Sequence, residues 1–321
     1  MNTICLIGAG QLGSRHLQAL KAVSSPLMIT VVDPFPPSLK MAKERYESAA
    51  GSDHHSIQYL SDLEAIGTAY DVVIIATNSD TRRPLTEQLL ARASVRFLIL
   101  EKILFQKHED YQIVGDLLEK NHCQTWVDCS MRTMPFYRDL KNRVRSPLVY
   151  VATGSNYGLI TTSIHYLDHI AHLTGCCDYQ LITDGLEPTL IPGKRKGFLE
   201  LHGTLAARFK DGSYGSFSCF AEGNVPVHVE VHSAQGRVIS RENEQKAWLA
   251  GPETQWLWQD GAAPLPFQSQ MTAVVVEDLL SQGTCGLTPY AQSAQLHLTL
   301  LEGLSAFLSQ HGYPAEPYPF T

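Results

Sequence analysis

A glycine-rich turn near the start of the chain constrains the fold more than any other feature. An apolar run over residues 3–7 leads directly into Gly8-Ala9-Gly10-Gln11-Leu12-Gly13, and a helical pattern follows. A second apolar run over residues 28–32 ends at Asp33, about twenty residues beyond the last of these glycines. Strand, glycine-rich turn, helix, strand and terminal acid, in this order, predict a βαβ unit that binds a dinucleotide.

Each part of this segment has a physical role. Gly8 permits a tight turn, Gly10 lets the backbone approach the pyrophosphate, and Gly13 lets the helix pack closely on the sheet. The amide groups and the dipole of the first helical turn attract the phosphates. Asp33 would accept hydrogen bonds from the ribose hydroxyl groups and repel a 2′-phosphate, so NAD is favoured over NADP. The residues of this segment expected at the cofactor are Gly8, Gly10, Gln11, Leu12, Gly13 and Asp33.

Composition narrows the class of protein. With 321 residues the chain exceeds the size at which a single core stops growing, so two domains are expected. A net charge of −7 without basic blocks argues against nucleic-acid and anionic-membrane partners. The apolar stretches are too short to span a bilayer, and a strand that begins at residue 3 leaves no room for a signal peptide. Seven cysteines without a CxxC pair indicate buried or incidental thiols, which predicts a cytoplasmic location.

The pattern of apolar residues changes character along the chain. Up to about residue 128, buried apolar runs alternate with helical patterns, which predicts a parallel sheet of about six strands. From residue 148 on, strand-like runs joined by turns such as Asp211-Gly212-Ser213 predict antiparallel pairing, with helices over residues 163–173, 271–281 and 290–310. The predicted fold class is therefore α/β. Residues 1–122 form an N-terminal Rossmann domain with a doubly wound parallel sheet, and residues 123–321 form a C-terminal α+β domain with a large, mostly antiparallel open sheet.

The carboxyl ends of the parallel strands locate the expected chemistry. Ligands of an open parallel sheet bind there, so the glycine turn, Ala76-Thr77-Asn78 and Glu101-Lys102 should all meet the cofactor. Glu101-Lys102 lies where the nicotinamide end of an extended dinucleotide should lie. A lysine at this place can hold a substrate oxygen, and can exchange its proton if desolvation lowers the lysine pKa. The structural alternative is a solvated lysine that follows a strand.

The arrangement resembles the glucose-fructose oxidoreductase/inositol dehydrogenase/MocA family, or Gfo/Idh/MocA family, over nearly the whole chain. The segments that carry the resemblance are the glycine turn, Ala76-Thr77-Asn78, Glu101-Lys102-Ile103, Met131-Arg132 with Pro135, and the helix start from Thr161 through His165 to Asp168. The resemblance implies that Lys102 and His165 are catalytic, that Ala76, Thr77, Asn78 and Glu101 lie at the cofactor, and that Arg132, Thr161 and Asp168 lie at the substrate.

The same resemblance implies an activity and an assembly. It implies hydride transfer between NAD and a secondary alcohol of a sugar or sugar-nucleotide-like substrate. It also implies a homodimer or homotetramer formed through the sheet of the second domain. The segment Gly154–Leu159 is similar to a subgroup associated with bacterial surface-glycan biosynthesis.

Two positions depart from the family pattern. The proline that follows the lysine in relatives is Ile103 here. The aspartate expected four residues before the histidine is Thr161, which can form hydrogen bonds but carries no charge. A Lys-Asp-His arrangement therefore becomes a Lys–His pair, and the rate or its pH dependence should differ from that of relatives.

Several residues keep a structural alternative. His165 suits acid–base chemistry because an imidazole changes charge near neutral pH, or it is a buried histidine bonded to backbone. His165, His169 and His172 share one helix face and form a candidate metal site, although no metal is the prediction. Arg132 binds an anionic group or forms a salt bridge, and Asp168 orients a substrate contact or supports the helix. Arg82 or Arg83 could reach toward the substrate.

Two other functions remain open at this stage. One is a lyase or epimerase that uses tightly bound NAD for a transient oxidation. The other is a non-catalytic, NAD-responsive regulatory protein, which the uncharged Thr161 keeps open.

Overall fold

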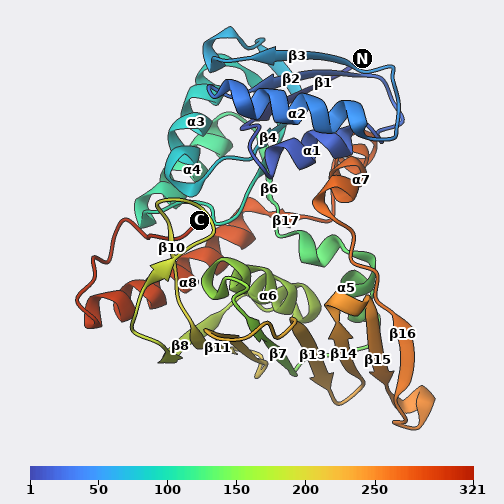
Figure 1. Ribbon diagram of the computed structural model, residues 1–321, viewed down its shortest axis with the longest axis vertical. Helices are drawn as coiled ribbons and strands as arrows, with labels where there is room; N and C mark the ends of the chain where they lie inside the picture. Colours follow the sequence, from blue (N-terminus) through green and yellow to red (C-terminus); the bar gives the residue numbers. More distant parts are fainter. The chain divides into compact units, whose positions relative to one another are not determined.

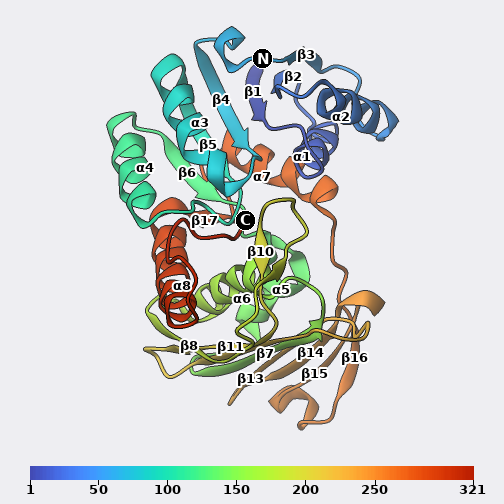
Figure 2. The ribbon, with the colours of Figure 1, turned by 60° about the vertical axis from the view of Figure 1, so that its left-hand side comes forward.

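Two units make up the computed structural model, which describes all residues from Met1 to Thr321 (Figures 1 and 2). The first unit comprises Met1–Phe105, Glu109–Asp128 and Pro266–Ala291. The second comprises Gln106–His108, Cys129–Leu265 and Gln292–Thr321. The sequence predicts a single division between residues 122 and 123. The structure differs, because residues 266–291 return to the first unit.

The first unit is built on the predicted parallel sheet. Its strand order is β17-β6-β5-β4-β1-β2-β3, and every pair is parallel except β17 with β6. Because β1 lies between β2 and β4, the chain reverses its direction of winding at β1, where doubly wound sheets bind ligands. The strands are β1 (Asn2–Ile7), β2 (Leu27–Val32), β3 (Ser56–Leu60), β4 (Ala69–Ile75), β5 (Ser94–Leu100), β6 (Gln124–Val127) and β17 (Thr288–Pro289).

Helices cover both faces of this sheet. In Figures 1 and 2, α1, α2 and α7 lie on one face and α3 and α4 on the other. The core between them is apolar because the strands carry unbroken aliphatic runs, and Leu6, Leu17, Val72 and Val276 are fully buried. The helices are α1 (Gly13–Leu20), α2 (Pro36–Ser48), α3 (Ser79–Arg92), α4 (His108–Lys120) and α7 (Gln268–Gln282), with a short 3-10 helix η1 (Leu63–Ala65).

The second unit contains an eight-stranded sheet of order β16-β15-β14-β13-β7-β12-β11-β8. Its pairs are antiparallel except for β7 with β12, so the α+β prediction of a large, mostly antiparallel sheet is confirmed. The strands are β7 (Leu148–Ser155), β8 (Tyr179–Leu186), β11 (Gly203–Phe209), β12 (Tyr214–Phe220), β13 (His228–Ser233), β14 (Arg237–Arg241), β15 (Lys246–Ala250) and β16 (Gln259–Ala262). A separate hairpin pairs β9 (Ile191–Pro192) with β10 (Leu199–Glu200).

One face of this sheet carries the helices of the unit. Figures 1 and 2 show α5 (Pro135–Asp139), α6 (Leu159–Thr174) and α8 (Tyr290–Gln310) on the same face. Tyr150 of β7 and Phe217 of β12 are fully buried beneath α6, where both rings contact Tyr166. Helix α6 ends at Gly175, whose φ of +79° suits glycine. The remaining 3-10 helices are η2 (Ser130–Thr133), η3 (Leu140–Asn142), η4 (Glu242–Glu244) and η5 (Pro252–Thr254).

No helix of the structure combines the length and apolar character that crossing a membrane requires.

Candidate active site

The three glycines of the N-terminal turn differ in what surrounds them. Gly8 has a φ of +91°, a conformation that side chains disfavour. A Cβ on Gly13 would lie 1.9 Å from the Gly8 carbonyl oxygen, so the helix can approach the turn only with glycine there. A Cβ on Gly10 would meet nothing within 4 Å. The fold therefore requires Gly8 and Gly13, whereas Gly10 borders open space that a ligand can fill.

A cavity of about 580 Å³ opens at this turn. Its size is in the range of small-molecule sites, and it lies at the carboxyl ends of β1, β2 and β4. The sequence-predicted cofactor residues that line it are Gly8, Gly10, Asp33, Ala76, Thr77 and Asn78. Leu63 and Leu85 add apolar walls that sequence reasoning did not identify.

The Asp33 carboxylate is held at the edge of this cavity. Its Oδ2 accepts a hydrogen bond from the Ala9 amide at 2.7 Å, and its Oδ1 accepts one from the Phe35 amide at 2.9 Å. Because both bonds come from the backbone, the carboxylate cannot turn away from the glycine turn without losing them. Its negative charge is fixed where the ribose of a bound dinucleotide is expected.

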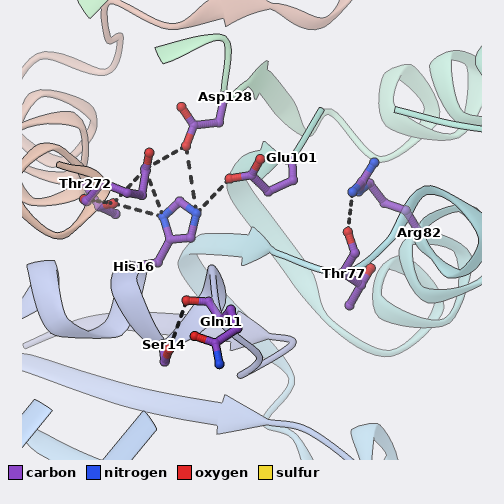
Figure 3. Close-up of polar contacts among 9 residues, drawn as sticks. Gln11, Ser14, His16, Thr77, Arg82, Glu101, Asp128 and Thr272 are labelled. Atoms are coloured by element: carbon purple, nitrogen blue, oxygen red, sulfur yellow. Dashed lines mark hydrogen bonds and ion pairs between the residues drawn. The ribbon is translucent and has the colours of Figure 1, made fainter. Parts of the chain in front are cut away.

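Gln11 and Leu12 complete the glycine turn. Leu12 is the residue that precedes α1, and Gln11 is exposed. The carbonyl oxygen of Gln11 accepts a hydrogen bond from the Ser14 hydroxyl at 3.1 Å, drawn in Figure 3. Arg45 of α2 also donates to that carbonyl oxygen at 3.0 Å and to Gln11 Oε1 at 2.7 Å. Sequence reasoning missed Arg45 because no local pattern ties α2 to the turn.

Arg82 fixes the backbone that follows β4 and β5. Its side chain is fully buried, and its guanidinium donates to the carbonyl oxygens of Ile103 and, at 2.7 Å, Leu104. It also donates to the carbonyl oxygen of Thr77 (Figure 3). Arg83 instead pairs with Asp110 at 2.9 Å. Both arginines thus serve the first unit's own structure, and the expectation that one reaches toward the substrate is wrong for Arg82.

A buried polar cluster lies beside the end of β5 (Figure 3). His16 Nε2 is 2.8 Å from Glu101 Oε1 and 3.8 Å from Asp128 Oδ2, and His16 Nδ1 is 2.9 Å from the Thr272 hydroxyl. The side-chain amide of Gln268 donates to Asp128 Oδ2 at 2.8 Å. The cluster joins α1, β5, β6 and α7, so it exists only because residues 266–291 return to the first unit.

The ionisation of the cluster follows from its burial and its charges. Burial opposes ionisation of Glu101, but the hydrogen bond and charge of His16, with Lys102 and Arg82, lower the Glu101 pKa to about 2. Burial lowers the His16 pKa, yet Glu101 outweighs burial and the pKa is raised. Burial and the Glu101 charge raise the Asp128 pKa to about 7. The favoured state at neutral pH is a buried imidazolium–carboxylate pair beside a second carboxyl group, Asp128, which is only partly ionised.

Glu101 is therefore buried against His16 rather than exposed to the cavity. The side chain of Glu101 is 4% exposed, and the neighbouring Lys102 is half-buried. The Lys102–Ile103 peptide bond is cis, and Ile103 is fully buried. Sequence reasoning identified Glu101 and Lys102 but missed His16 and Asp128. The available signal for Asp128 was its place at the end of a parallel strand.

The second unit brings the other candidates onto or against α6. Thr161 and His165 lie one helical turn apart, and both are half-buried. Arg132 Nε is 2.9 Å from Asp168 Oδ2, and both side chains are buried. Arg132 also donates to the side-chain oxygen of Gln292 at 3.4 Å. This contact agrees with the structural alternatives for the two residues, namely a salt bridge for Arg132 and support of the helix for Asp168.

The histidine face of α6 does not have the geometry of a metal site. The two ring nitrogens of His169 contact the Tyr137 carbonyl oxygen at 3.0 Å and the Tyr150 hydroxyl at 3.1 Å. Nε2 must donate to the carbonyl, so Nδ1 accepts from the hydroxyl and no lone pair is left for a metal. Burial lowers the pKa of His169 to about 3 and that of His172 to about 4, so both rings are neutral.

The fold and the site together define a class. A doubly wound unit with a glycine turn, a fixed acidic residue and a cavity at the strand ends has the architecture of dinucleotide-binding proteins. Residues 3–129 match the model of the Gfo/Idh/MocA oxidoreductase family, described as having an NAD-binding Rossmann fold. This part of the chain is therefore similar to that family, as its motifs indicated. No curated protein matches the chain.

Solved structures share the whole two-unit fold at low sequence identity. An oxidoreductase from Agrobacterium radiobacter in complex with NAD+, L-tartaric acid and magnesium is 18% identical, with a TM-score of 0.74 over 96% of this chain and 97% of that one. Levoglucosan dehydrogenase in complex with NADH and L-sorbose is 14% identical, with a TM-score of 0.72 over 97% of each chain. UDP-N-acetylglucosamine 3-dehydrogenase from Acidithiobacillus ferrooxidans is 14% identical, with a TM-score of 0.69 over 95% of this chain and 98% of that one.

Proposed function

We propose that this oxidoreductase transfers a hydride between NAD and a secondary alcohol or ketone of a sugar or sugar-nucleotide-like substrate. The observation that carries the cofactor choice is the Asp33 carboxylate, which two backbone amides hold at the cavity edge. A carboxylate fixed there accepts hydrogen bonds from the ribose hydroxyl groups and repels a 2′-phosphate, so NAD is preferred over NADP.

The residues of the first unit fit a dinucleotide. The open space beside Gly10 is where a backbone can approach a pyrophosphate, and a side chain at this position would fill it. Gln11, Leu12 and the first amides of α1 would surround the phosphates. Ala76, Thr77 and Asn78 line the same cavity and would lie along the nicotinamide half. When bound, NAD supplies the hydride-transfer chemistry, and the protein supplies placement and charge.

Lys102 and His165 would carry the proton chemistry. Lys102 directly follows Glu101, so the backbone that presents the lysine is held by the buried His16–Glu101 pair. Its ammonium group would bind the reacting oxygen of the substrate, and His165 would exchange the proton of that oxygen. Thr161 would contact the substrate. Arg132 and Asp168 would position the substrate indirectly, because their ion pair supports helix α6.

The substrate class rests on the comparisons and the family motifs. Two of the similar structures are named as sugar or sugar-nucleotide dehydrogenases. The segment Gly154–Leu159, which runs from the end of β7 to the first residue of α6, is the basis for proposing a role in bacterial surface-glycan biosynthesis. The sheet face opposite the helices exposes Val149, Phe220 and Trp248, which suits a homodimer or homotetramer formed through this sheet in the cytoplasm.

Turnover on a defined panel tests this function. Formation of NADH is followed by absorbance with free sugars, sugar acids and nucleotide sugars, using the protein and its Lys102→Met variant. We expect turnover on one substrate class, and a loss of about 100-fold or more in the variant with NAD binding retained. Near-normal turnover of the variant would remove Lys102 from the mechanism. NAD binding without turnover on the panel would favour a regulatory protein, and cofactor that stays bound through purification would favour a lyase or epimerase.

A further inference from the structure

The start of α6 is capped by a residue from outside the helix. Gly158 precedes the helix with a φ of +87° and supplies no side-chain hydrogen bond. The carboxylate of Glu200, in β10, accepts hydrogen bonds from the Ile160 amide at 2.9 Å and from the Thr161 amide at 3.0 Å. Glu200 is 5% exposed. A buried carboxylate from a separate hairpin therefore satisfies the first amides of the helix.

The same carboxylate contacts the position where the family pattern expects an acid. The Thr161 hydroxyl donates a hydrogen bond to Glu200 Oε1. An aspartate at position 161 would place its own carboxylate beside that of Glu200. Glycine at position 158 makes the contact between Thr161 and Glu200 possible. A Cβ at this position would lie 2.9 Å from the Thr161 hydroxyl and 3.2 Å from Glu200 Oε1. A negative charge is thus present at this site without an acidic residue at 161.

His165 lies on the same helix face, four residues after Thr161. Side chains four residues apart are neighbours along a helix, one turn of about 5.4 Å away. A charge beside the Thr161 side chain, which is one helical turn from His165, shifts a titrating group inside a protein by on the order of one pKa unit or more.

Other titratable groups near the start of α6 do not replace this charge. Burial raises the pKa of Tyr157 and of Cys219, so both are neutral at physiological pH. Lys194 Nζ is 3.4 Å from the Tyr157 carbonyl oxygen, and His202 contacts Asn156. None of these four side chains is an anion.

We infer that Glu200 supplies the carboxylate that Thr161 lacks and acts as a positioning residue for His165. It holds the first turn of α6 and favours the protonated imidazole, so Thr161 and Glu200 together do the work of one aspartate. The inference rests on the proposed function, in which His165 exchanges the substrate proton.

Two substitutions separate this role from capping alone. Glu200→Gln removes the charge and keeps one acceptor oxygen, which can cap one of the two amides that Oε1 and Oε2 now accept. Glu187→Gln removes an exposed charge from the same unit and is the matched control. We expect Glu200→Gln to lower kcat about tenfold, with KM changed much less, and to move the acidic limb of the pH profile down by about one unit. Adding Thr161→Asp to Glu200→Gln should restore both. Thr161→Asp alone should impair the enzyme, because two carboxylates would then lie within hydrogen-bonding distance.

A titration that needs no substrate keeps this inference separate from the proposed function. Histidine-selective 13C labelling gives the imidazole signals, and the His165 signal is assigned by its loss in His165→Gln. We expect Glu200→Gln to lower the His165 pKa by about one unit and Thr161→Asp to restore it in that background. An unchanged His165 titration in Glu200→Gln would overturn the inference, whether or not a substrate has been found. Absence of turnover in the unmodified protein would instead count against the proposed function.

Discussion

Replacing His16 tests whether the buried cluster of the first unit is held by charge. His16→Gln removes the imidazolium and leaves Glu101, whose side chain is 4% exposed, without its 2.8 Å partner. Breaking a buried pair by removing one member costs about 3–5 kcal/mol of unfolding free energy. For a unit of this size that corresponds to a fall of about 6–20 °C in Tm.

The pH dependence gives the prediction its sign. The Glu101 pKa is lowered, so its contribution is present above its unfolded pKa of about 4.3 and is lost as the pH falls toward 2. The His16 pKa is raised, so its contribution is fully present below its unfolded pKa of about 6.5 and is lost as the pH rises through the folded value. The stability difference between the protein and His16→Gln should therefore be largest between about pH 5 and 6.5.

Urea unfolding at several pH values, followed by circular dichroism, measures this difference. His54→Gln is the control, because His54 is an exposed histidine of the same unit. His16→Gln with Glu101→Gln should recover part of the loss, since no charge then stays buried without a partner. A His16→Gln midpoint that is unchanged at pH 6, or a loss equally large at pH 3, would refute the reasoning.

Four further outcomes are expected. Gly10→Ala should keep the stability of the unmodified protein and bind NAD at least about tenfold more weakly in a cofactor titration. Gly13→Ala should lose about 3 kcal/mol or more of unfolding free energy, which calorimetry can measure. Binding titrations should find NAD preferred at least about tenfold over NADP, and Asp33→Ala should narrow that gap; equal affinities in the unmodified protein would contradict the assignment. Arg132→Met should cost about 3–5 kcal/mol, and Asp168→Leu added to it should restore much of that loss in urea unfolding. Turnover should be insensitive to EDTA, and inhibition by the chelator would revive a metal site.

The elements that the sequence predicted well are those defined by local burial. Helix α8 lies at residues 290–310 as expected, because its apolar spacing spans the whole helix. The parallel sheet was predicted from unbroken aliphatic runs such as β4 and β5, which only a doubly covered sheet accommodates. The tight turn predicted at Gly8 and the close helix packing predicted at Gly13 agree with the surroundings of these two glycines.

The features that escaped prediction depend on contacts between distant segments. Helix α6 begins at Leu159, not at the predicted residue 163, because Glu200 caps it from about forty residues away. His16 and Asp128 looked unremarkable in sequence, since their cluster forms only when α1, β5, β6 and α7 meet. Arg82 resembled a candidate substrate contact because nothing local shows that its guanidinium binds backbone carbonyls.

The late position of residues 266–291 in the chain has a consequence for biosynthesis. Helix α7 buries Val276 and Leu279 in the first unit, and it contacts α1, yet it leaves the ribosome after most of the second unit. Until then the nascent N-terminal part exposes the apolar surface that α7 will cover, which is the kind of surface that chaperones recognise. Translation stalled or terminated before this helix should yield an aggregation-prone polypeptide, although the six parallel strands β1 to β6 have already been made.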